Sequence, residues 1–377
     1  MPSDAEDAWI DDAWITVSRS ALRHNYAAVR GLVASEAEQP PQVIAVVKAN
    51  AFGHGAVETA RVFEEAGADF FAVTTPAEAL ELRAGGIRGR ILMFLPPLPG
   101  QAAALCAAGV EVTVCDAAGL DSLGEAASEG VEAAVHLKVD TGMGRLGALP
   151  PDVVPLARRI QAAPGLRLAG VYTHFARALE QDEAATHKQF AAFQSVLVDL
   201  ARAGIEPGLR HCANSAALVR FPEMRLDAVR PGTILYGQYP SGAVPRLLDL
   251  QETWRMQARI VSVRDVPAGS RIGYGGEWTA RRPSRLAVLP VGYAEGFTVS
   301  PASAAAGWRG LKALLRPTKP TVTVRGRRAP VVGRVAMQIC TVDVTDIPGV
   351  SVGDVVTVPA RRITASARLP RVFGEEL

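Results

Sequence analysis

A lysine at the end of an apolar run is the first residue of this chain whose position suggests chemistry. Residues 43–48 have the composition of a buried strand that ends in Lys48, and a glycine-containing segment, residues 49–55, follows. Burying an ammonium group is costly unless the group is paired or loses its proton. A desolvated lysine with a lowered pKa is suited to forming a Schiff base with a carbonyl compound. A strand-end lysine more often extends into solvent, so Lys48 alone is a weak indication.

Further segments carry charged, polar or aromatic residues, and most of them contain glycine. They are residues 136–147 with Lys138 and Arg145, 172–175 with His174, 211–216 with Asn214 and Ser215, 230–237 with Arg230, Gly232 and Thr233, 272–275 with Tyr274, 291–296 with Tyr293, and 333–337 with Met337. Each has an ordinary structural alternative, such as a turn aromatic for Tyr274 or a core histidine for His174. Lys138 has the alternative of pairing with Asp140, and the two arginines that of surface ion pairs. The histidines lack the His-Glu-x-x-His spacing, so no metal site is predicted.

Apolar runs alternate with amphipathic segments over the first two-thirds of the chain. The predicted strands are residues 43–48, 70–74, 91–95, 111–115, 135–140, 168–174, 209–214 and the stretch around 228–235, and predicted helices include 55–66, 76–84 and 183–203. Apolar strands that alternate with helices predict a parallel sheet covered on its faces. Eight such units over about 200 residues predict a closed (β/α)₈ barrel, whose active site would lie at the C-terminal ends of the strands.

The pattern changes after about residue 241. Strand-like runs at 254–263, 285–291, 321–325 and 339–344 are separated by Pro/Gly turns. This pattern predicts a second, mostly antiparallel β domain. We therefore expect a barrel domain over residues 1–244 and a β domain over residues 245–377, with the first residues of the chain as candidates for pairing with the β domain.

Composition excludes several classes of protein. Lys and Arg number 40 and Asp and Glu 38, for a net charge of +2, which argues against nucleic-acid binding. Hydrophobic residues make up 49% and charged residues 21%, which is enough for a packed core. The four cysteines lie far apart and predict reduced thiols. The apolar stretch 91–110 is broken by prolines and the chain start is acidic, so we expect no membrane span, no export signal and a cytoplasmic location.

The segment that begins with Lys48 resembles the pyridoxal-phosphate attachment signature of the alanine racemases. The other segments named above resemble further blocks of that family in the same order and spacing, over about residues 12–358. The resemblance implies a barrel followed by a β domain, pyridoxal 5'-phosphate as cofactor, and interconversion of L- and D-alanine. It also implies a homodimer with shared active sites and a small amino acid as substrate.

The same resemblance implies roles for single residues. Lys48 would bind the cofactor covalently and act as one base, and Tyr274 of the partner subunit would be the second base. The implied cofactor contacts are Arg145, His174, Asn214, Ser215, Arg230, Gly232 and Thr233, and the implied substrate contacts are Arg145, Met337 and Tyr293. Lys138 matches a position that is carbamylated in many members.

These implied roles agree with the chemistry of racemisation. The Cα proton must leave one face and return on the other, and two bases on opposite faces avoid moving one base across a planar intermediate. An arginine opposite the pyridine nitrogen does not readily supply a proton. The cofactor is then a weaker electron sink, which discourages transamination.

The sequence also departs from the family pattern. Phe52 replaces a tyrosine whose hydroxyl reaches the phosphate, and Gln338 stands where Asp or Asn is common. The shortened C-terminal stretch, residues 359–377, lacks a segment with a tyrosine that lines the phosphate site and the inner gate. These departures leave open a related enzyme that acts on a larger amino acid in a specialised pathway. A non-catalytic pyridoxal-phosphate-binding protein is a further alternative, and a decarboxylase is disfavoured because both bases are present.

Lys48 is expected to carry the cofactor. Borohydride reduction of the pyridoxal-phosphate-loaded protein, followed by peptide mapping, should place the label on Lys48, because reduction makes a Schiff base permanent. A label on Lys138 or Lys188 would contradict this assignment.

Overall fold

The computed structural model describes residues 12–34, 39–127, 132–299 and 319–377. The chain divides into two units, of which one is Arg19–Glu252 and the other combines Met1–Ser18 with Thr253–Leu377. The boundary expected from the sequence, after residue 244, lies in the loop that precedes Thr253. Most of the acidic chain start, residues 1–11, lies outside the described residues.

The unit Arg19–Glu252 is built around a ring of parallel strands. Its strands pair in the order β2-β10-β9-β8-β7-β6-β5-β4-β3. β2 and β3 flank Ile44 and act as one interrupted strand, so the nine segments close into eight strand positions. The strands are β2 (Gln42–Val43), β3 (Ala45–Val46), β4 (Phe70–Val73), β5 (Arg90–Met93), β6 (Val110–Val114), β7 (Ala133–Lys138), β8 (Leu166–Tyr172), β9 (Leu209–Asn214) and β10 (Ala228–Arg230). The predicted (β/α)₈ barrel is confirmed.

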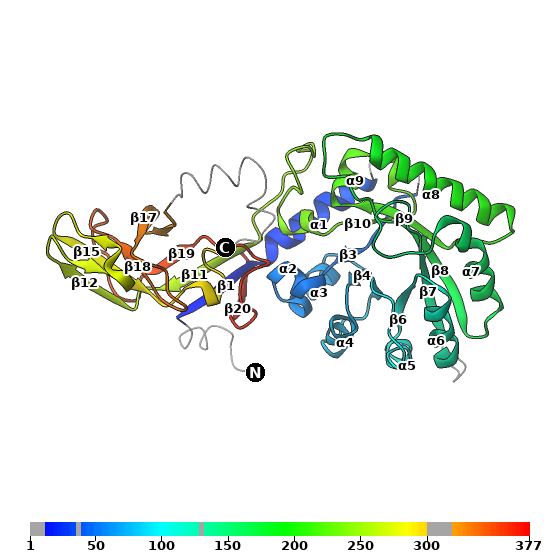
Figure 1. The fold of residues 1–377 in the computed structure, drawn as a ribbon, viewed down its shortest axis with the longest axis horizontal. Coiled ribbons are helices and arrows are strands. Elements are labelled where there is room, and N and C mark those ends of the chain that lie inside the picture. Colours follow the sequence, from blue (N-terminus) through cyan, green and yellow to red (C-terminus); the bar gives the residue numbers. More distant parts are fainter. Residues whose placement is uncertain (1–11, 35–38, 128–131, 300–318) are drawn as a thin grey trace. The chain divides into compact units, whose positions relative to one another are not determined.

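Helices cover the outside of this ring (Figure 1). They are α1 (Arg19–Ala34), α3 (Ala56–Glu65), α4 (Pro76–Ala84), α5 (Ala102–Ala107), α6 (Ala117–Ala127), α7 (Pro150–Ala162), α8 (Ala184–Arg202) and α9 (Ser215–Arg220). The segment α2 (Lys48–Gly53) is not a regular α-helix, because residues 49–52 have left-handed backbone angles. The apolar face of α7 shows why the helices pack on the sheet: its buried residues are Val153, Leu156, Ala157 and Ile160. This is the i, i+3, i+4, i+7 spacing of an amphipathic helix.

The first and last barrel strands end earlier than the apolar runs predict. β3 ends at Val46, and the residues that follow Lys48 form a turn with left-handed backbone angles. β10 ends at Arg230 because Pro231 has no N–H to continue the ladder, and a 3-10 helix, Thr233–Tyr236, follows. Both differences place chemistry-bearing residues at the ends of strands.

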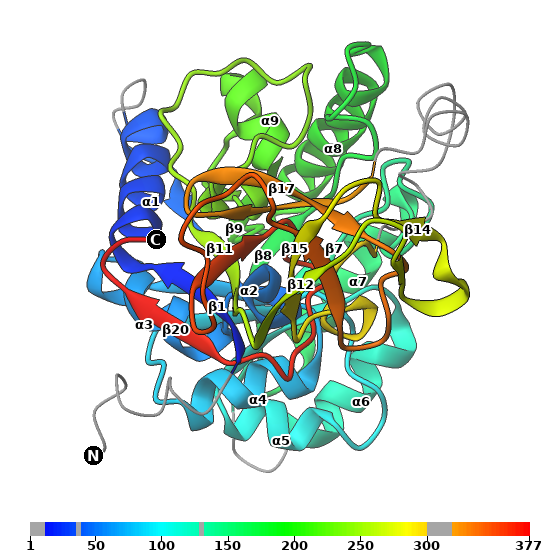
Figure 2. The same cartoon turned by 90° about the vertical axis from the view of Figure 1, so that its left-hand side faces the viewer.

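The second unit is a mostly antiparallel nine-stranded sheet with the order β12-β15-β18-β17-β16-β19-β11-β1-β20 (Figure 2). Its strands, with a separate hairpin of β13 and β14, are β1 (Ala13–Ser18), β11 (Trp254–Arg259), β12 (Ser262–Val266), β13 (Arg271–Ile272), β14 (Trp278–Thr279), β15 (Ser284–Leu289), β16 (Thr321–Val324), β17 (Arg327–Val332), β18 (Cys340–Asp343), β19 (Val355–Val358) and β20 (Arg371–Gly374). β1 pairs antiparallel with β11 and parallel with β20. The predicted run 254–263 is two strands, since β11 pairs with β1 and β19 whereas β12 pairs with β15.

Alternating burial explains why this unit forms a sheet. Along β11, Trp254, Met256 and Ala258 are buried and the residues between them are partly exposed. This period of two is typical of a strand with one buried face. Among the helices that the structure describes, none combines the length and the apolarity that crossing a membrane requires.

Candidate active site

A pocket of about 630 Å³ opens at the C-terminal ends of the barrel strands. Its lining includes every barrel residue singled out from the sequence, namely Lys48, Lys138, Arg145, His174, Asn214, Ser215, Arg230, Gly232 and Thr233. It also includes apolar residues that the sequence did not single out, among them Phe94, Leu95, Leu146, Leu179 and Pro240. The lining residues that the structure describes include four Lys and Arg side chains and no carboxylate. A pocket of this size and charge suits a small ligand with negative groups.

Lys48 enters the pocket from a strained backbone segment. The four residues that follow it, 49–52, all have left-handed backbone angles, with φ between 51° and 54°. This conformation costs roughly 1–2 kcal/mol per non-glycine residue. The Asn50 side chain holds one end of the turn, because its Oδ1 accepts the Ala56 N–H at 2.8 Å. Strain of this kind persists where the surrounding structure enforces it, and such places are often functional sites.

Burial and like charge lower the pKa values of basic groups in the pocket. Burial lowers the pKa of Lys48, and the charge of Arg145 lowers it further. Burial, with the charges of Arg230 and Arg145, lowers the pKa of Lys138 to about 8. Burial and the charge of Arg230 lower the pKa of His174 to about 3. The pocket therefore favours neutral, nucleophilic forms of its amines and a neutral imidazole.

The loop that carries Arg145 is organised around the carboxylate of Asp140. Its Oδ1 accepts the backbone N–H groups of residues 142–144 at 2.9–3.1 Å. Burial raises the pKa of Asp140, but these bonds outweigh burial and lower it. Gly147 closes the loop at a φ of 131°, and a Cβ there would lie 2.6 Å from the Asp140 nitrogen, so only glycine fits.

Strands β9 and β10 bring Ser215 and Gly232 together. The Gly232 N–H donates to Ser215 Oγ at 2.8 Å. The Asn214 side chain caps α9 by accepting the N–H groups of residues 216 and 217. A Cβ at Gly232 would lie 3.0 Å from the Phe52 ring, so this wall depends on the missing side chain. Hydroxyl and backbone N–H groups gathered in this way are typical donors to phosphate.

Arg230 is almost fully buried, with 3% of its surface exposed. Its Nη2 donates to the carbonyl oxygens of Thr173 at 2.7 Å and Cys212 at 3.2 Å. Its Nη1 donates to His211 Nδ1 at 2.7 Å, and the guanidinium lies 5.2 Å from the centre of the Tyr172 ring. The side chain is held in one orientation by these contacts.

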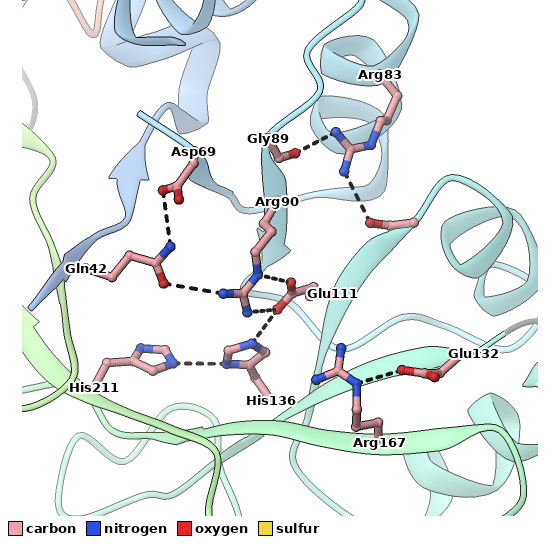
Figure 3. A network of polar contacts seen from close by, with 11 residues as sticks. Gln42, Asp69, Arg83, Gly89, Arg90, Glu111, Glu132, His136, Arg167 and His211 are labelled. Atoms are coloured by element: carbon pink, nitrogen blue, oxygen red, sulfur yellow. Dashed lines mark hydrogen bonds and ion pairs between the residues drawn. The ribbon is translucent and has the colours of Figure 1, made fainter. Parts of the chain in front are cut away.

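A buried relay continues from His211 through the barrel interior (Figure 3). His211 Nε2 lies 3.0 Å from His136 Nδ1, and His136 Nε2 lies 2.7 Å from Glu111 Oε2. The Glu111 carboxylate accepts two further bonds from Arg90, at 2.5 and 2.9 Å. Because a guanidinium only donates and a carboxylate only accepts, both imidazoles must be neutral and protonated at Nε2. Burial lowers the pKa of His136 and of His211, in agreement with this assignment.

Sequence reasoning missed Glu111, His136 and Arg90 as contributors to the site. The available signal was the position of Glu111 within an otherwise apolar strand, since a buried carboxylate must find partners. Burial raises the pKa of Glu111, but the hydrogen bonds from His136 and Arg90 outweigh burial and lower it to about 2.

The remaining predicted site residues belong to the β unit. Tyr274, Tyr293 and Met337 have exposed fractions of 71%, 50% and 58%. Gln338 donates to the Glu295 carboxylate at 3.2 Å, so its amide is used within its own unit.

Fold and pocket together are those of a barrel enzyme that works with a bound cofactor. A family model described as the alanine racemase N-terminal domain matches residues 17–240, and one described as the C-terminal domain matches residues 253–369. The alanine racemase of Desulforamulus reducens is 43% identical over 349 residues, which cover 92% of this chain and 89% of the relative. That of Methanococcus maripaludis is 39% identical over 367 residues, which cover 97% and 93%. A solved alanine racemase of Clostridium difficile superposes with a TM-score of 0.87 at 29% identity and covers 97% of each chain. The chain belongs to the alanine racemase family, whose members are pyridoxal-phosphate-dependent isomerases.

The described pocket fits pyridoxal phosphate. The cofactor carries an aldehyde, and Lys48 offers an amine whose pKa is lowered. It also carries a phosphate, and the pocket is basic, with a Ser215 hydroxyl that can donate while its oxygen accepts the Gly232 N–H. The pocket volume lies within the range of small-molecule and cofactor sites.

Replacing Asp140 with Asn should loosen the loop that carries Arg145. The neutral amide accepts more weakly, and its NH₂ group opposes the Gly144 N–H that Oδ2 of the carboxylate now accepts. Amide hydrogen exchange at residues 142–144 should accelerate by about fivefold, the equivalent of about 1 kcal/mol. Asp116→Asn is the control, because Asp116 accepts the N–H of Gly119 in the first turn of α6, away from the Arg145 loop. Unchanged exchange at Gly144 in Asp140→Asn would show that the carboxylate does not organise the loop.

Proposed function

We propose that this chain interconverts L- and D-alanine with pyridoxal phosphate by a two-base mechanism. The observation that carries the proposal is the basic pocket at the strand ends, with its desolvated Lys48, in a chain that matches both family domains. The relatives named above at 39% and 43% identity are alanine racemases, which favours alanine as the substrate.

Residues at the ends of several strands would bind the cofactor jointly. Lys48 would attach it covalently, His174 would pack against its ring, and Arg230 would face its ring nitrogen. Arg145 would contact its phenolic oxygen, and the phosphate would be received by Asn214, Ser215 and the backbone near Gly232 and Thr233. All of these residues line one pocket, which supports their acting on one ligand.

When bound, pyridoxal phosphate supplies an electron sink that lets a proton leave the Cα atom of an amino acid. Lys48 would take or return this proton on one face, and the lowering of its pKa by burial favours the neutral amine that a base requires. Tyr274 of the partner subunit would do the same on the opposite face. Neither base then has to cross the plane of the reacting atoms.

Arg230 would protect the reaction from a side path. It donates hydrogen bonds but does not readily give up a proton, so a cofactor ring nitrogen held against it would stay unprotonated. A weaker electron sink disfavours transamination, in which the proton returns to the wrong carbon. The relay through His211 and His136 to Glu111 keeps Arg230 in place for this role.

Lys138 is proposed to be carbamylated. With a pKa of about 8, a useful fraction of its amine is neutral near neutral pH. A neutral amine adds CO₂ to give a carbamate and releases a proton. The new negative charge would orient Arg145, whose charge acts on Lys138 in the structure.

The active form is proposed to be a homodimer with shared sites. Tyr274, Tyr293 and Met337 expose much of their side chains in the β unit, which leaves them available to a partner subunit. Met337 would contact the substrate carboxylate through its backbone together with Arg145, and Tyr293 would line the entrance.

The test of the proposed function is an exchange experiment in deuterated water. The parent protein should form D-alanine from L-alanine and place deuterium at Cα. Tyr274→Phe should retain the cofactor but lose proton exchange from one enantiomer far more than from the other, because only one face loses its base. Equal loss for both enantiomers would contradict the role of Tyr274 as a base.

Hybrid dimers provide the matched control. Inactive Lys48→Ala and inactive Tyr274→Phe should regain activity when mixed, because one site of each hybrid draws both intact residues. Absence of recovery after confirmed subunit exchange would indicate that each site is built within one chain.

The alternative is a related activity on a larger amino acid, which the alanine racemase relatives do not favour. The family tyrosine of the inner gate has no counterpart in residues 359–377. The apolar wall of Leu95, Leu146 and Leu179 lines the same pocket as Lys48 and offers a surface for a longer side chain. A substrate panel scored for Cα exchange distinguishes this alternative from alanine. The non-catalytic alternative is disfavoured, since the chain matches the C-terminal family domain as well as the barrel.

Phe52→Tyr should slow the loss of pyridoxal phosphate on dialysis. Phe52 lies beside Gly232 and stacks at 4.8 Å on Tyr236, whose hydroxyl already donates to the Val46 carbonyl. A new hydroxyl could donate to the phosphate, and a bond to a charged group contributes about 1.5–3 kcal/mol, or roughly tenfold or more in affinity.

Phe94→Tyr adds a hydroxyl to the same pocket, near Lys48, and is the control that should not slow cofactor loss. Tight retention in the parent, unchanged by Phe52→Tyr, would show that other groups replace the family tyrosines at the phosphate.

A further inference from the structure

We infer that Glu78 is a positioning residue: it clamps the left-handed turn that follows Lys48 and thereby aims the Lys48 amine into the pocket. The inference deepens the proposed function and rests on attachment of the cofactor at Lys48. Its evidence is the set of hydrogen bonds made by the two oxygens of one carboxylate.

Glu78 joins two segments that are far apart in the sequence. Its Oε1 accepts the N–H of Ala49 at 2.6 Å. Its Oε2 accepts the N–H groups of Thr74 and Thr75 at 2.8 and 3.1 Å. One carboxylate therefore ties the residue after Lys48 to the C-terminal end of β4 and the start of α4.

The bond to Ala49 acts directly on Lys48. The N–H of Ala49 belongs to the same planar peptide unit as the carbonyl of Lys48. Fixing this N–H therefore fixes the orientation of that peptide unit and the backbone angle ψ of Lys48. That angle orients the chain at the point where the lysine side chain departs.

The turn needs such a restraint because it is strained. Residues 49–52 hold left-handed angles without a glycine among them. The bond from Asn50 to Ala56 restrains the distal part of the turn, whereas Glu78 restrains the part next to Lys48. Relaxation at Ala49 would shift the lysine away from its present position.

Helix capping explains only half of what Glu78 does. Thr75 and Glu78 form a capping box at the start of α4, in which the Thr75 hydroxyl accepts the Glu78 N–H and Oε2 accepts the Thr75 N–H. Glutamine serves this role as well as glutamate. The additional bond to Ala49 requires a second acceptor oxygen, which only a carboxylate has.

The charge of Glu78 agrees with a role near Lys48. The Glu78 carboxylate raises the pKa of Lys48, against the larger effects of burial and Arg145, which lower it. The carboxylate is therefore close enough to act on the lysine electrostatically, although it is not part of the pocket lining.

Glu78→Gln and Thr75→Ala separate the two roles. In Glu78→Gln the amide oxygen can retain the bonds to Thr74 and Thr75, but the NH₂ group then opposes the N–H of Ala49. Amide exchange at Ala49, measured by NMR on the pyridoxal-phosphate-loaded protein, should accelerate by about fivefold or more. When apoprotein is mixed with pyridoxal phosphate, Schiff-base formation followed by absorbance should slow by about tenfold.

Thr75→Ala should affect the helix and not the turn, because it removes a capping bond and leaves the Glu78 carboxylate intact. Its Tm should fall, while Ala49 exchange and the rate of Schiff-base formation stay at parent values. Equal effects of the two variants on Schiff-base formation would overturn the inference and assign Glu78 to helix capping alone.

The parent protein is itself informative if Glu78→Gln does not fold. Its Ala49 amide should be protected from exchange, and an unprotected amide would overturn the inference. A parent that forms the Schiff base at Lys48 but does not racemise alanine would contradict the proposed function while leaving the clamp supported. A cofactor attached elsewhere would overturn both.

Discussion

Burial of several cationic side chains in one pocket, together with the repulsion between them, is the constraint on which the rest of this site depends. Lys48, Lys138, Arg145 and Arg230 line a single cavity in which the described lining holds no carboxylate. Burial, and to a smaller extent the neighbouring positive charges, lower the pKa of Lys48 and of Lys138, which favours their neutral and reactive amines. Buried charges without compensating partners would destabilise the fold. The carboxylates that offset these positive charges lie outside the pocket lining. Glu78 acts on Lys48, Asp140 acts on Lys138, and Glu111 is connected to Arg230 through two histidines.

The barrel makes this arrangement possible because its parallel strands end together while their interior side chains remain in contact. Glu111 lies near the start of β6, His136 and His211 lie within β7 and β9, and Arg230 ends β10. The relay thus runs from the N-terminal side of the barrel interior to the pocket. Every member has a partner, as buried polar groups require. The space for the relay is also specified: a Cβ at Gly170 would lie 2.6 Å from His136 Nδ1, so a side chain there would displace the imidazole.

Much of the fold was predictable because its signals are local. The predicted helix 76–84 and strand 209–214 have the same bounds as α4 and β9. The start of α4 is marked locally, by the capping box of Thr75 and Glu78. The predicted strand 43–48 was too long at its functional end. Nothing in the sequence between Lys48 and Gly53 specifies a left-handed turn of four non-glycine residues, because its stability comes from bonds to residues outside it. Glu111, His136 and Arg90 escaped notice for the same reason, as their partners lie on strands β5, β6, β7 and β9.

The amino-acid sequence by itself determined the alternation of strands and helices, the change to a β domain, and the family blocks that carry Lys48, Arg145, His174 and Arg230. Periodicity, composition and block order are properties of short segments, so they can be recognised before the chain is folded. The tertiary structure alone decided which residues share the pocket, which carboxylate faces which cation, and where the backbone strain lies. Hydrogen bonds and shifted pKa values depend on the distance between groups and on their exclusion from water. Those quantities are set only when segments far apart in the chain, such as Lys48–Gly53 and the start of α4, are brought together.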